Sequence, residues 1–357
     1  MASDFPAGES QDHARRPGPL LSILVPIYNV APWLEECVNS ILSQHTGDDV
    51  ELILLDDAST DGSLALAQML ADRHPGRVIL MAHEVNEGLS AARNSMLGRA
   101  RGRHVWFVDS DDMVMDGALP TLLDILRRHD PDVVICDYSK NGARDVSAFA
   151  GKAWTLDHDR DALLRGVFQR RQLHAWLRIS RRALWGSDLR FPIGRVFEDV
   201  ATTPALMLRA RSYYHVPRPF IFYRWRPGSI LSSVRGGRFD QRKHDDFVYA
   251  LSGLKEDMAA RLPEASMETR FRISYFIEKE FSKVGYRLLK SAIKQPDLRP
   301  VDATIRRYYH AFGQSSPIAF RQLPAMYWRR GDIFRWMVLR YFLSRVGSPE
   351  MPVARAA

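Results

Sequence analysis

The stretch Arg103-His-Val-Trp-Phe-Val-Asp-Ser-Asp-Asp112 decides how the rest of the chain is interpreted. Its apolar part, residues 105–108, is rich in residues that favour β-structure, so a buried strand is expected there. Asp109, Asp111 and Asp112 follow this strand without a spacer. Carboxylates this close repel one another and need a cation or hydrogen-bond donors. Because Mg²⁺ and Mn²⁺ prefer oxygen ligands, the strand end is a candidate metal site, and a solvated acidic turn is the alternative.

Composition is typical of a soluble globular protein. The 357 residues suffice for one large domain or two ordinary ones, and 46% are hydrophobic and 26% charged. The net charge of +8 favours an anionic partner such as a nucleotide or an anionic membrane surface. Nucleic acid is not expected as a partner, because no motif for binding it accompanies the charge. Cys37 and Cys136 lie in apolar runs, which predicts buried thiols in a reducing compartment.

The two ends of the chain differ from its middle. Residues 1–19 are polar and lack an apolar core, so we expect a flexible tail and not a signal peptide. No run reaches the ~18 apolar residues of a membrane span. Residues 236–357 are predicted to be helical, and their last part is aromatic and basic. Arg330, Arg335 and Arg340 are five residues apart, so they lie on different sides of that helix and do not line one face. Docking on the catalytic domain and contact with a membrane surface therefore remain alternatives.

Strands and helices alternate through the first half of the chain. The predicted strands are residues 20–25, 50–55, 78–81, 105–108 and 132–136. A predicted helix separates each strand from the next, which indicates βαβ units and a parallel sheet. Four polar segments fall at the carboxyl ends of these strands: 26–29, 56–57, 86–87 and 109–112. Because ligands bind beyond the carboxyl ends of parallel strands, the four segments are expected to form one site at one sheet edge.

Several kinds of site are excluded by the motifs that the chain lacks. The first predicted strand is followed by Pro26-Ile-Tyr-Asn29, which is not the G-x-G-x-x-G turn of a dinucleotide fold. The chain has no G-x-x-x-x-G-K-[ST] segment, so a P-loop enzyme is not expected. No cluster of histidine and cysteine has the spacing of a zinc site. Carboxylates for a hard metal and basic residues for phosphate are the signals that remain.

Four motifs, in this order, resemble those of the family 2 glycosyltransferases: Leu24-Val-Pro-Ile-Tyr-Asn29, Leu55-Asp-Asp-Ala-Ser-Thr-Asp-Gly-Ser63, Asn86-Glu-Gly-Leu-Ser-Ala-Ala-Arg-Asn94 and Phe107-Val-Asp-Ser-Asp-Asp112. The resemblance covers about residues 20–235. It implies an α/β chain with the GT-A fold, in which helices flank a Rossmann-like, mostly parallel sheet, here with a helical C-terminal extension. It also implies a nucleotide-binding half, 20–138, an acceptor half, 139–235, and an inverting enzyme whose expected donor is a UDP-sugar.

The resemblance implies a set of nucleotide-sugar-binding residues. Pro26, Tyr28 and Asn29 match the turn that lines the nucleoside pocket. Asp57 matches the carboxylate that binds the base. The segment near the ribose and diphosphate is matched by Asn86, Gly88 and Arg93. In the D-x-D motif, Asp111 is the expected direct metal ligand and Asp109, nearer the ribose, the second. Ser110 lies between them in the donor site. The implied cofactor is a divalent cation, Mn²⁺ or Mg²⁺.

A segment further along resembles the Trp-x-Lys part of the family's acceptor side. It reads His174-Ala-Trp-Leu-Arg178, so Trp176 and Arg178 are candidate acceptor residues. Arg178 stands where lysine is usual, and an arginine fork does not make the same contact as an ammonium group. His174 is expected to be structural. The implied acceptor is a glycan or a lipid-linked glycan, in the synthesis of a bacterial-type surface polysaccharide.

Two more segments complete the implied catalytic machinery. Phe197-Glu-Asp-Val200 resembles the Glu-Asp motif that supplies the catalytic base, for which Asp199 is expected and Glu198 is the alternative. The segment 222–230 resembles the part that closes over the donor phosphates, and contributes Arg224, Arg226 and Ser229. An inverting transfer needs a base for the acceptor proton, and a metal ion and cations to stabilise the leaving diphosphate.

Two rival functions remain open at this point. The Asp109 loop also resembles that of haloacid-dehalogenase-type phosphatases, in which the first aspartate is the nucleophile. That family has the loop after its first strand, whereas several βα units precede it here. A non-catalytic nucleotide-sugar-binding module is the other alternative, and the presence of every acidic motif argues against it. For the transferase we expect a cytoplasmic location, with peripheral binding to the inner face of the plasma membrane as an option.

Overall fold

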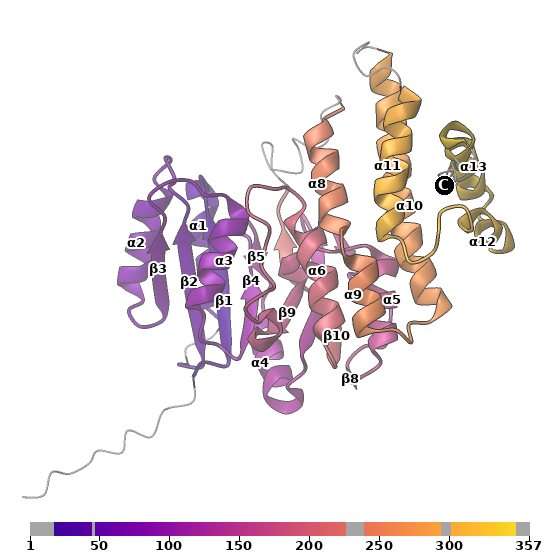
Figure 1. Ribbon diagram of the computed structural model, residues 1–357. Coiled ribbons are helices and arrows are strands. Elements are labelled where there is room, and N and C mark those ends of the chain that lie inside the picture. Colours follow the sequence, from indigo (N-terminus) through magenta and orange to yellow (C-terminus); the bar gives the residue numbers. More distant parts are fainter. Residues whose placement is uncertain (1–17, 45–46, 226–238, 294–300, 348–357) are drawn as a thin grey trace, which may run out of the picture.

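The computed structural model of the protein describes residues 18–44, 47–225, 239–293 and 301–347, and ten strands of these ranges form one sheet (Figure 1). The strands are β1 Leu21–Ile27, β2 Val50–Asp56, β3 Val78–Ala82, β4 His104–Phe107, β5 Met113–Val114, β6 Val133–Lys140, β7 Arg144–Val146, β8 Leu156–Asp157, β9 Arg178–Arg181 and β10 Tyr213–Tyr223. Their order is β3-β2-β1-β4-β9-β6-β10-β5, with β7 beside β6 and β8 beside β10.

Helices connect the strands and then continue beyond the sheet. Those of the α/β part are α1 Ala31–Leu42, α2 Ser63–Arg73, α3 Leu89–Arg99, α4 Ala118–His129, α5 Arg160–Arg170 and α6 Glu198–Arg209, with the short 3₁₀ turns η1 Ala175–Leu177 and η2 Arg182–Trp185. Those of the C-terminal region are α8 Gln241–Leu251, α9 Leu254–Arg261, α10 Met267–Ala292, α11 Val301–Ser315, α12 Leu323–Arg329 and α13 Ile333–Val346. The predicted α/β fold with a helical C-terminal region is therefore confirmed.

The first half of the sheet is parallel, as the sequence predicts. Strand β1 pairs in parallel with β2 and with β4, and β2 pairs in parallel with β3. All seven residues of β1 are buried, which is typical of a parallel strand that helices cover on both faces. The carboxyl ends of these four strands consequently lie at the same edge of the sheet.

The second half of the sheet is mixed. Strand β9 lies between β4 and β6 and is antiparallel to both. Strand β10 runs parallel to β6, and β5 pairs with β10 in the antiparallel direction. Since β5 follows the acidic loop 109–112, this pairing brings that loop beside the end of β10.

The C-terminal helices pack on the acceptor half and share its core. Helix α10 contacts α5 and α11, and α8 and α9 both contact α6. Figure 1 shows α10 to α13 on the side of the molecule away from α2 and β3. Within this region the buried Glu278 accepts a hydrogen bond from Tyr327 at 2.7 Å and pairs with Arg335. No helix of the described residues is long and apolar enough to cross a membrane.

One glycine allows the close approach of two central strands. The amide of Gly102, just before β4, donates to Ser22 Oγ at 2.8 Å. A Cβ atom at Gly102 would lie 2.4 Å from the backbone nitrogen of Ser22, so β1 and β4 would have to separate. Gly98, in α3, is a matched contrast, because a Cβ atom there would meet nothing within 4 Å.

We expect Gly102→Ala to lower the free energy of unfolding by about 1–3 kcal/mol through this overpacking. Gly98→Ala should raise it by up to about 1 kcal/mol, because alanine favours the helix. Urea unfolding followed by far-ultraviolet circular dichroism measures both. Equal stability of the Gly102→Ala and wild-type proteins would contradict the close β1–β4 approach.

Candidate active site

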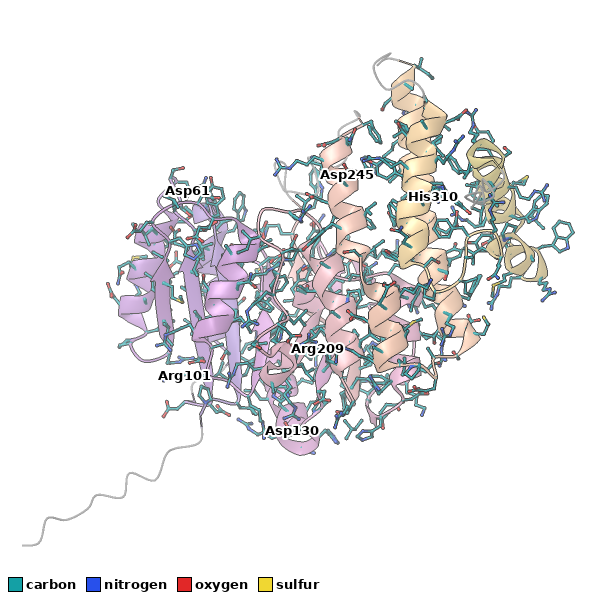
Figure 2. The ribbon with its side chains drawn as sticks, viewed as in Figure 1. Asp61, Arg101, Asp130, Arg209, Asp245 and His310 are labelled. Atoms are coloured by element: carbon teal, nitrogen blue, oxygen red, sulfur yellow. The ribbon has the colours of Figure 1, made fainter. Side chains whose placement is uncertain are left out.

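The predicted polar segments meet at one edge of the sheet. The segments after β1, β2, β3 and β4 all leave that edge, because the four strands are parallel. Figure 2 shows Asp61, in the turn after β2, at this edge, and Arg101 and Asp130 at the opposite edge. The N-terminus of α6 and the end of β10 add residues from the second half of the chain. The site therefore combines both halves of the α/β region.

The nucleoside turn after β1 is fastened to the turn after β2. Asn29 has a left-handed backbone, with φ at 53°, and its side-chain oxygen accepts a hydrogen bond from the amide of Thr60 at 2.8 Å. Its own amide donates to Ser59 Oγ at 3.1 Å. Tyr28 is about half exposed and so presents its ring at the site, whereas Pro26 is buried within β1. Of the three predicted residues, Tyr28 is the most exposed, Asn29 is partly exposed, and Pro26 offers no surface to a ligand.

Asp57 joins the turn after β2 to the segment after β3. Its carboxylate accepts hydrogen bonds from the amides of Glu87 at 3.0 Å and Gly88 at 2.7 Å. His83 lies 2.7 Å from the same carboxylate through Nδ1, and the Asn86 side chain donates to the Asp57 carbonyl at 3.3 Å. Gly88 has a φ of 88°, which only glycine adopts readily. Both carboxylate oxygens of Asp57 thus already hold the frame of the predicted nucleoside pocket.

Arg93 connects three carboxylates that lie far apart in the sequence. Its Nη1 donates to Glu198 Oε1 and to Asp199 Oδ1, each at 3.0 Å, and its Nη2 donates to Asp109 Oδ1 at 3.0 Å. The side chain is 1% exposed. The sequence analysis assigns Arg93 to the donor site, but its guanidinium group is occupied by these carboxylates. It is the residue that brings the D-x-D motif and the expected base together.

The pKa values at this cluster follow from burial and from the ratio of one guanidinium group to three carboxylates. Burial acts to lower the pKa of Arg93, but Asp199, Asp109 and Glu198 outweigh it and hold the pKa well above its ordinary value. Burial raises the pKa of Asp109 to about 6 against the opposing effect of Arg93. Burial and the neighbouring Asp199 raise the pKa of Glu198 to about 7. A carboxyl group with a pKa near neutrality suits general base catalysis.

The acidic loop after β4 has one buried and two partly exposed carboxylates. Asp112 is buried and accepts a hydrogen bond from the amide of Arg224 at 2.8 Å, while its other oxygen has no hydrogen-bond partner among the described residues. Burial and the charges of Asp109 and Asp111 raise the pKa of Asp112. Asp109 and Asp111 are partly exposed, and Ser110, between them, is buried.

The residues of this loop fit a divalent ion that a substrate helps to hold. Within the described ranges, no three or more histidine, cysteine, aspartate or glutamate side chains are arranged as a complete metal site. Mg²⁺ commonly takes only one or two carboxylates together with substrate phosphates. Asp111 and Asp109 supply two such carboxylates, and behind them Asp112 has a buried oxygen without a hydrogen-bond partner among the described residues.

The predicted phosphate-binding segment is described only in part. Arg224 follows β10, and its Nη2 donates to Glu36 of α1 at 2.6 Å. Its backbone holds Asp112, so Arg224 fixes the acidic loop to the end of β10. Arg226 and Ser229 lie outside the described residues.

The two predicted acceptor residues are buried and do not face an open surface. Trp176 is stacked between His174 and Tyr223, with ring centroids 5.0 Å and 5.9 Å away. Arg178, on the central strand β9, is 1% exposed and donates to the carbonyl of His174 at 2.9 Å. Burial lowers the pKa of Arg178 to about 10. Direct acceptor contact by these side chains is therefore not supported, and their observed partners are His174 and Tyr223.

His174 and His83 are the site residues that the sequence analysis missed. His174 is partly exposed, and its Nδ1 lies 3.8 Å from Asp199 Oδ2, although it was expected to be structural only. His83 directly follows β3 and contacts Asp57. Its position at a strand carboxyl end was the one available signal for His83. The sequence carried no signal for the contact between His174 and Asp199, because the two residues belong to different elements and are neighbours only in space.

Comparisons with known proteins agree with this geometry. The model of the glycosyl transferase family 2 matches residues 22–176. Glycosyltransferase GlyG of Streptococcus pneumoniae is 32% identical over 266 residues, which cover 71% of this chain and 85% of GlyG. TuaG of Bacillus subtilis, a glycosyltransferase named for teichuronic acid biosynthesis, is 27% identical over 65% of this chain and 87% of its own. TarS 1–349 of S. aureus, solved with UDP-GlcNAc, is similar in fold, with a TM-score of 0.67, 22% identity, and coverage of 90% of this chain and 91% of that one.

Removal of the Arg93 charge should expose how much the site depends on it. We expect Arg93→Met to lower the free energy of unfolding by about 3–5 kcal/mol at pH 7, because buried carboxylates lose their counter-charge. The loss should shrink at pH 5. Asp109 and Glu198 have pKa values raised to about 6 and about 7, so below these values both hold a proton in the folded state and their part of the charge penalty disappears. Urea unfolding at the two pH values measures this.

Arg73→Met is the matched control for that prediction. Arg73 pairs with Glu35 at 3.3 Å, and both side chains are about half exposed. Loss of an exposed pair of this kind should cost less than about 1 kcal/mol at either pH. A cost for Arg93→Met as small as that for Arg73→Met would show that the buried cluster does not depend on the guanidinium charge.

Proposed function

Because this chain belongs to glycosyl transferase family 2 and is a glycosyltransferase, we propose that it transfers a sugar from a nucleoside-diphosphate sugar to a hydroxyl group with inversion. The expected donor is a UDP-sugar and the expected acceptor a glycan or lipid-linked glycan in surface polysaccharide synthesis. The observation that carries the proposal is the Arg93 cluster, which holds a D-x-D carboxylate and the expected base in one set of hydrogen bonds.

The donor is expected to bind along the edge formed by the first three turns. Tyr28 would lie against the nucleoside, and the turn that Asp57 holds would face the base and the ribose. The complex of TarS with UDP-GlcNAc supports uridine as the nucleoside. The relative named for teichuronic acid biosynthesis supports a surface polysaccharide as the product.

The chemistry requires a base on one side of the transferred sugar and charge stabilisation on the other. A divalent ion held by Asp111 and Asp109 would stabilise the negative charge of the leaving diphosphate. Arg93 holds Asp199 and Glu198 at the same sheet edge as Asp109, so its own role is to position these groups. No protein nucleophile is needed for a single in-line displacement.

Asp199 is our first choice for the base, and Glu198 is the alternative. Both accept a hydrogen bond from Arg93 Nη1. Asp199 also faces His174, which could hold its carboxylate in orientation. The two carboxylates are adjacent and share this cation, so a change in the charge of one alters the electrostatic environment of the other.

We place the protein in the cytoplasm, bound peripherally at the inner face of the plasma membrane when it meets a lipid-linked acceptor. The two cysteines support the location, since Cys37 and Cys136 are both buried free thiols, which are typical of a reducing compartment.

Nucleotide binding tests the donor site and the metal site together. We expect UDP to bind more tightly than GDP or dTDP, and only when Mn²⁺ or Mg²⁺ is present. Asp111→Ala should weaken UDP binding by about tenfold or more, because one metal ligand is lost. Isothermal titration calorimetry measures both. Asp116→Ala is the control, since Asp116 is exposed and lies beyond β5. Failure of a folded sample to bind any of the three nucleotides would overturn the proposal.

The choice of base is tested by neutral replacements of equal size. With the donor and acceptor found by a screen on the preferred nucleotide, Asp199→Asn should lower kcat by about 10²- to 10⁴-fold, the usual contribution of a general base. Glu198→Gln should cost less, while UDP binding stays close to wild type in both. If Glu198 is the base, wild-type kcat/KM should fall as the pH drops below about 7, because burial and the neighbouring Asp199 raise the pKa of Glu198 to about 7. A larger loss in Glu198→Gln would make Glu198 the base.

A further inference from the structure

Helix α13 has an apolar surface on the side that faces solvent. Phe334 is 67% exposed and Met337 51%, and Ile333 and Tyr341 are exposed as well. These four positions share one face of the helix by their spacing. The opposite face packs on the protein through Leu339 and other buried residues. A surface helix usually carries polar residues on its outer face, so α13 is unusual in being apolar on both sides.

The exposed surface continues onto α12. Trp328, 59% exposed, lies with its ring centroid 5.4 Å from that of Trp336, and Trp336 in turn stacks against Arg340. In Figure 2 the side chains on the outer side of α12 and α13 point away from α10, with no other described element beside them. We name this surface the α12–α13 face, and define it by Trp328, Ile333, Phe334, Met337 and Tyr341.

The charges around this face are positive. Arg329 and Arg340 are exposed, and neither has an acidic partner among the ion pairs of the described residues. Three other arginines of α12, α13 and their connection are already paired: Arg330 with Glu268, Arg335 with Glu278, and Arg345 with Asp302. Asp332, the acidic residue at the edge, caps the amide of Arg335 at the start of α13. An apolar surface with uncompensated arginines results.

We infer that the α12–α13 face docks on an anionic lipid surface. Exposed tryptophan, phenylalanine and methionine can enter the boundary between headgroups and acyl chains, while arginines at the rim pair with lipid phosphates. A second copy of the chain is a poorer occupant, because a symmetric contact would bring the arginines of both copies together. The 14 residues of α13 reach only ~21 Å, too short to cross a bilayer, so the helix lies on the surface.

The attachment of α13 to the rest of the protein gives this docking a consequence for catalysis. Arg335 fixes α13 to Glu278 of α10, and Phe342 packs directly against Gly285 of α10. Helix α10 in turn packs on α5 in the acceptor half. Docking would therefore hold the active site at a defined orientation to the bilayer. This inference rests on the proposed peripheral location, but its test needs neither nucleotide nor acceptor.

The test is flotation of the full chain with two kinds of vesicle, one of phosphatidylcholine alone and one that also contains phosphatidylglycerol. We expect binding to the anionic vesicles, weakened by about tenfold or more in the triple variant Phe334→Ser, Met337→Ser, Tyr341→Ser. Arg329→Gln with Arg340→Gln should weaken it by roughly 25-fold, about a factor of five for each arginine, and remove the preference for anionic lipid.

The control variant is Leu64→Ser with Met69→Ser. Both are exposed apolar residues of α2, far from α13 at the other side of the molecule (Figure 1), so binding should equal that of wild type. Absence of flotation of the wild-type chain would overturn the inference, and so would equal flotation of the triple variant. Self-association that the triple variant abolishes, in place of lipid binding, would assign the face to a dimer and overturn it too. UDP binding that persists in every variant would keep the proposed function intact.

Discussion

The buried guanidinium of Arg93 is the interaction on which the candidate site depends. It lies in the first half of α3, between β4 and α6, and makes one hydrogen bond to each of three carboxylates. The rings of Phe191 and Phe107, 5.2 Å and 5.9 Å from its central carbon, screen it from water. A charge buried this deeply is stable only when opposite charges accompany it. Arg93 therefore fixes the acidic loop after β4 against the N-terminus of α6, and the two cannot separate without exposing unpaired charge.

The same cluster leaves an excess of negative charge, and this excess explains the electrostatics of the site. One cation faces Asp109, Glu198 and Asp199, while Asp111 and Asp112 lie close to Asp109. Burial in such surroundings favours the protonated form, so the pKa of Asp109 rises to about 6 and that of Glu198 to about 7. Uncompensated carboxylates at a sheet edge are suited to receive a divalent cation at one end and a proton at the other. An inverting transfer needs both at once.

The sequence predicts the edge of the sheet better than it predicts the side-chain contacts there. The central strand was expected at 105–108 and is found at 104–107, and each polar segment lies at the carboxyl end of its strand. Local periodicity determines these features. The insertion of β9 between β4 and β6, and the contacts of Arg93 with residues more than a hundred positions away, depend on long-range packing that no local pattern reveals. A family motif likewise identifies Trp176 and Arg178, but it does not tell whether a side chain meets a ligand or a neighbouring residue.

The positive charges are another feature whose contacts the sequence does not reveal. The net charge of +8 indicates an anionic partner, yet it does not show which arginines meet that partner. The structure separates them by their surroundings: Arg93 and Arg335 are buried against carboxylates, and Arg178 is buried beneath the site. An arginine that balances an internal carboxylate contributes to the fold and adds nothing to the attraction of a ligand. With Arg335 placed in the core, the helix whose arginines had seemed spread around its axis presents one apolar face bordered by unpaired charge. Pairing within the protein, and not the count of charges, therefore decides where an anionic partner can bind.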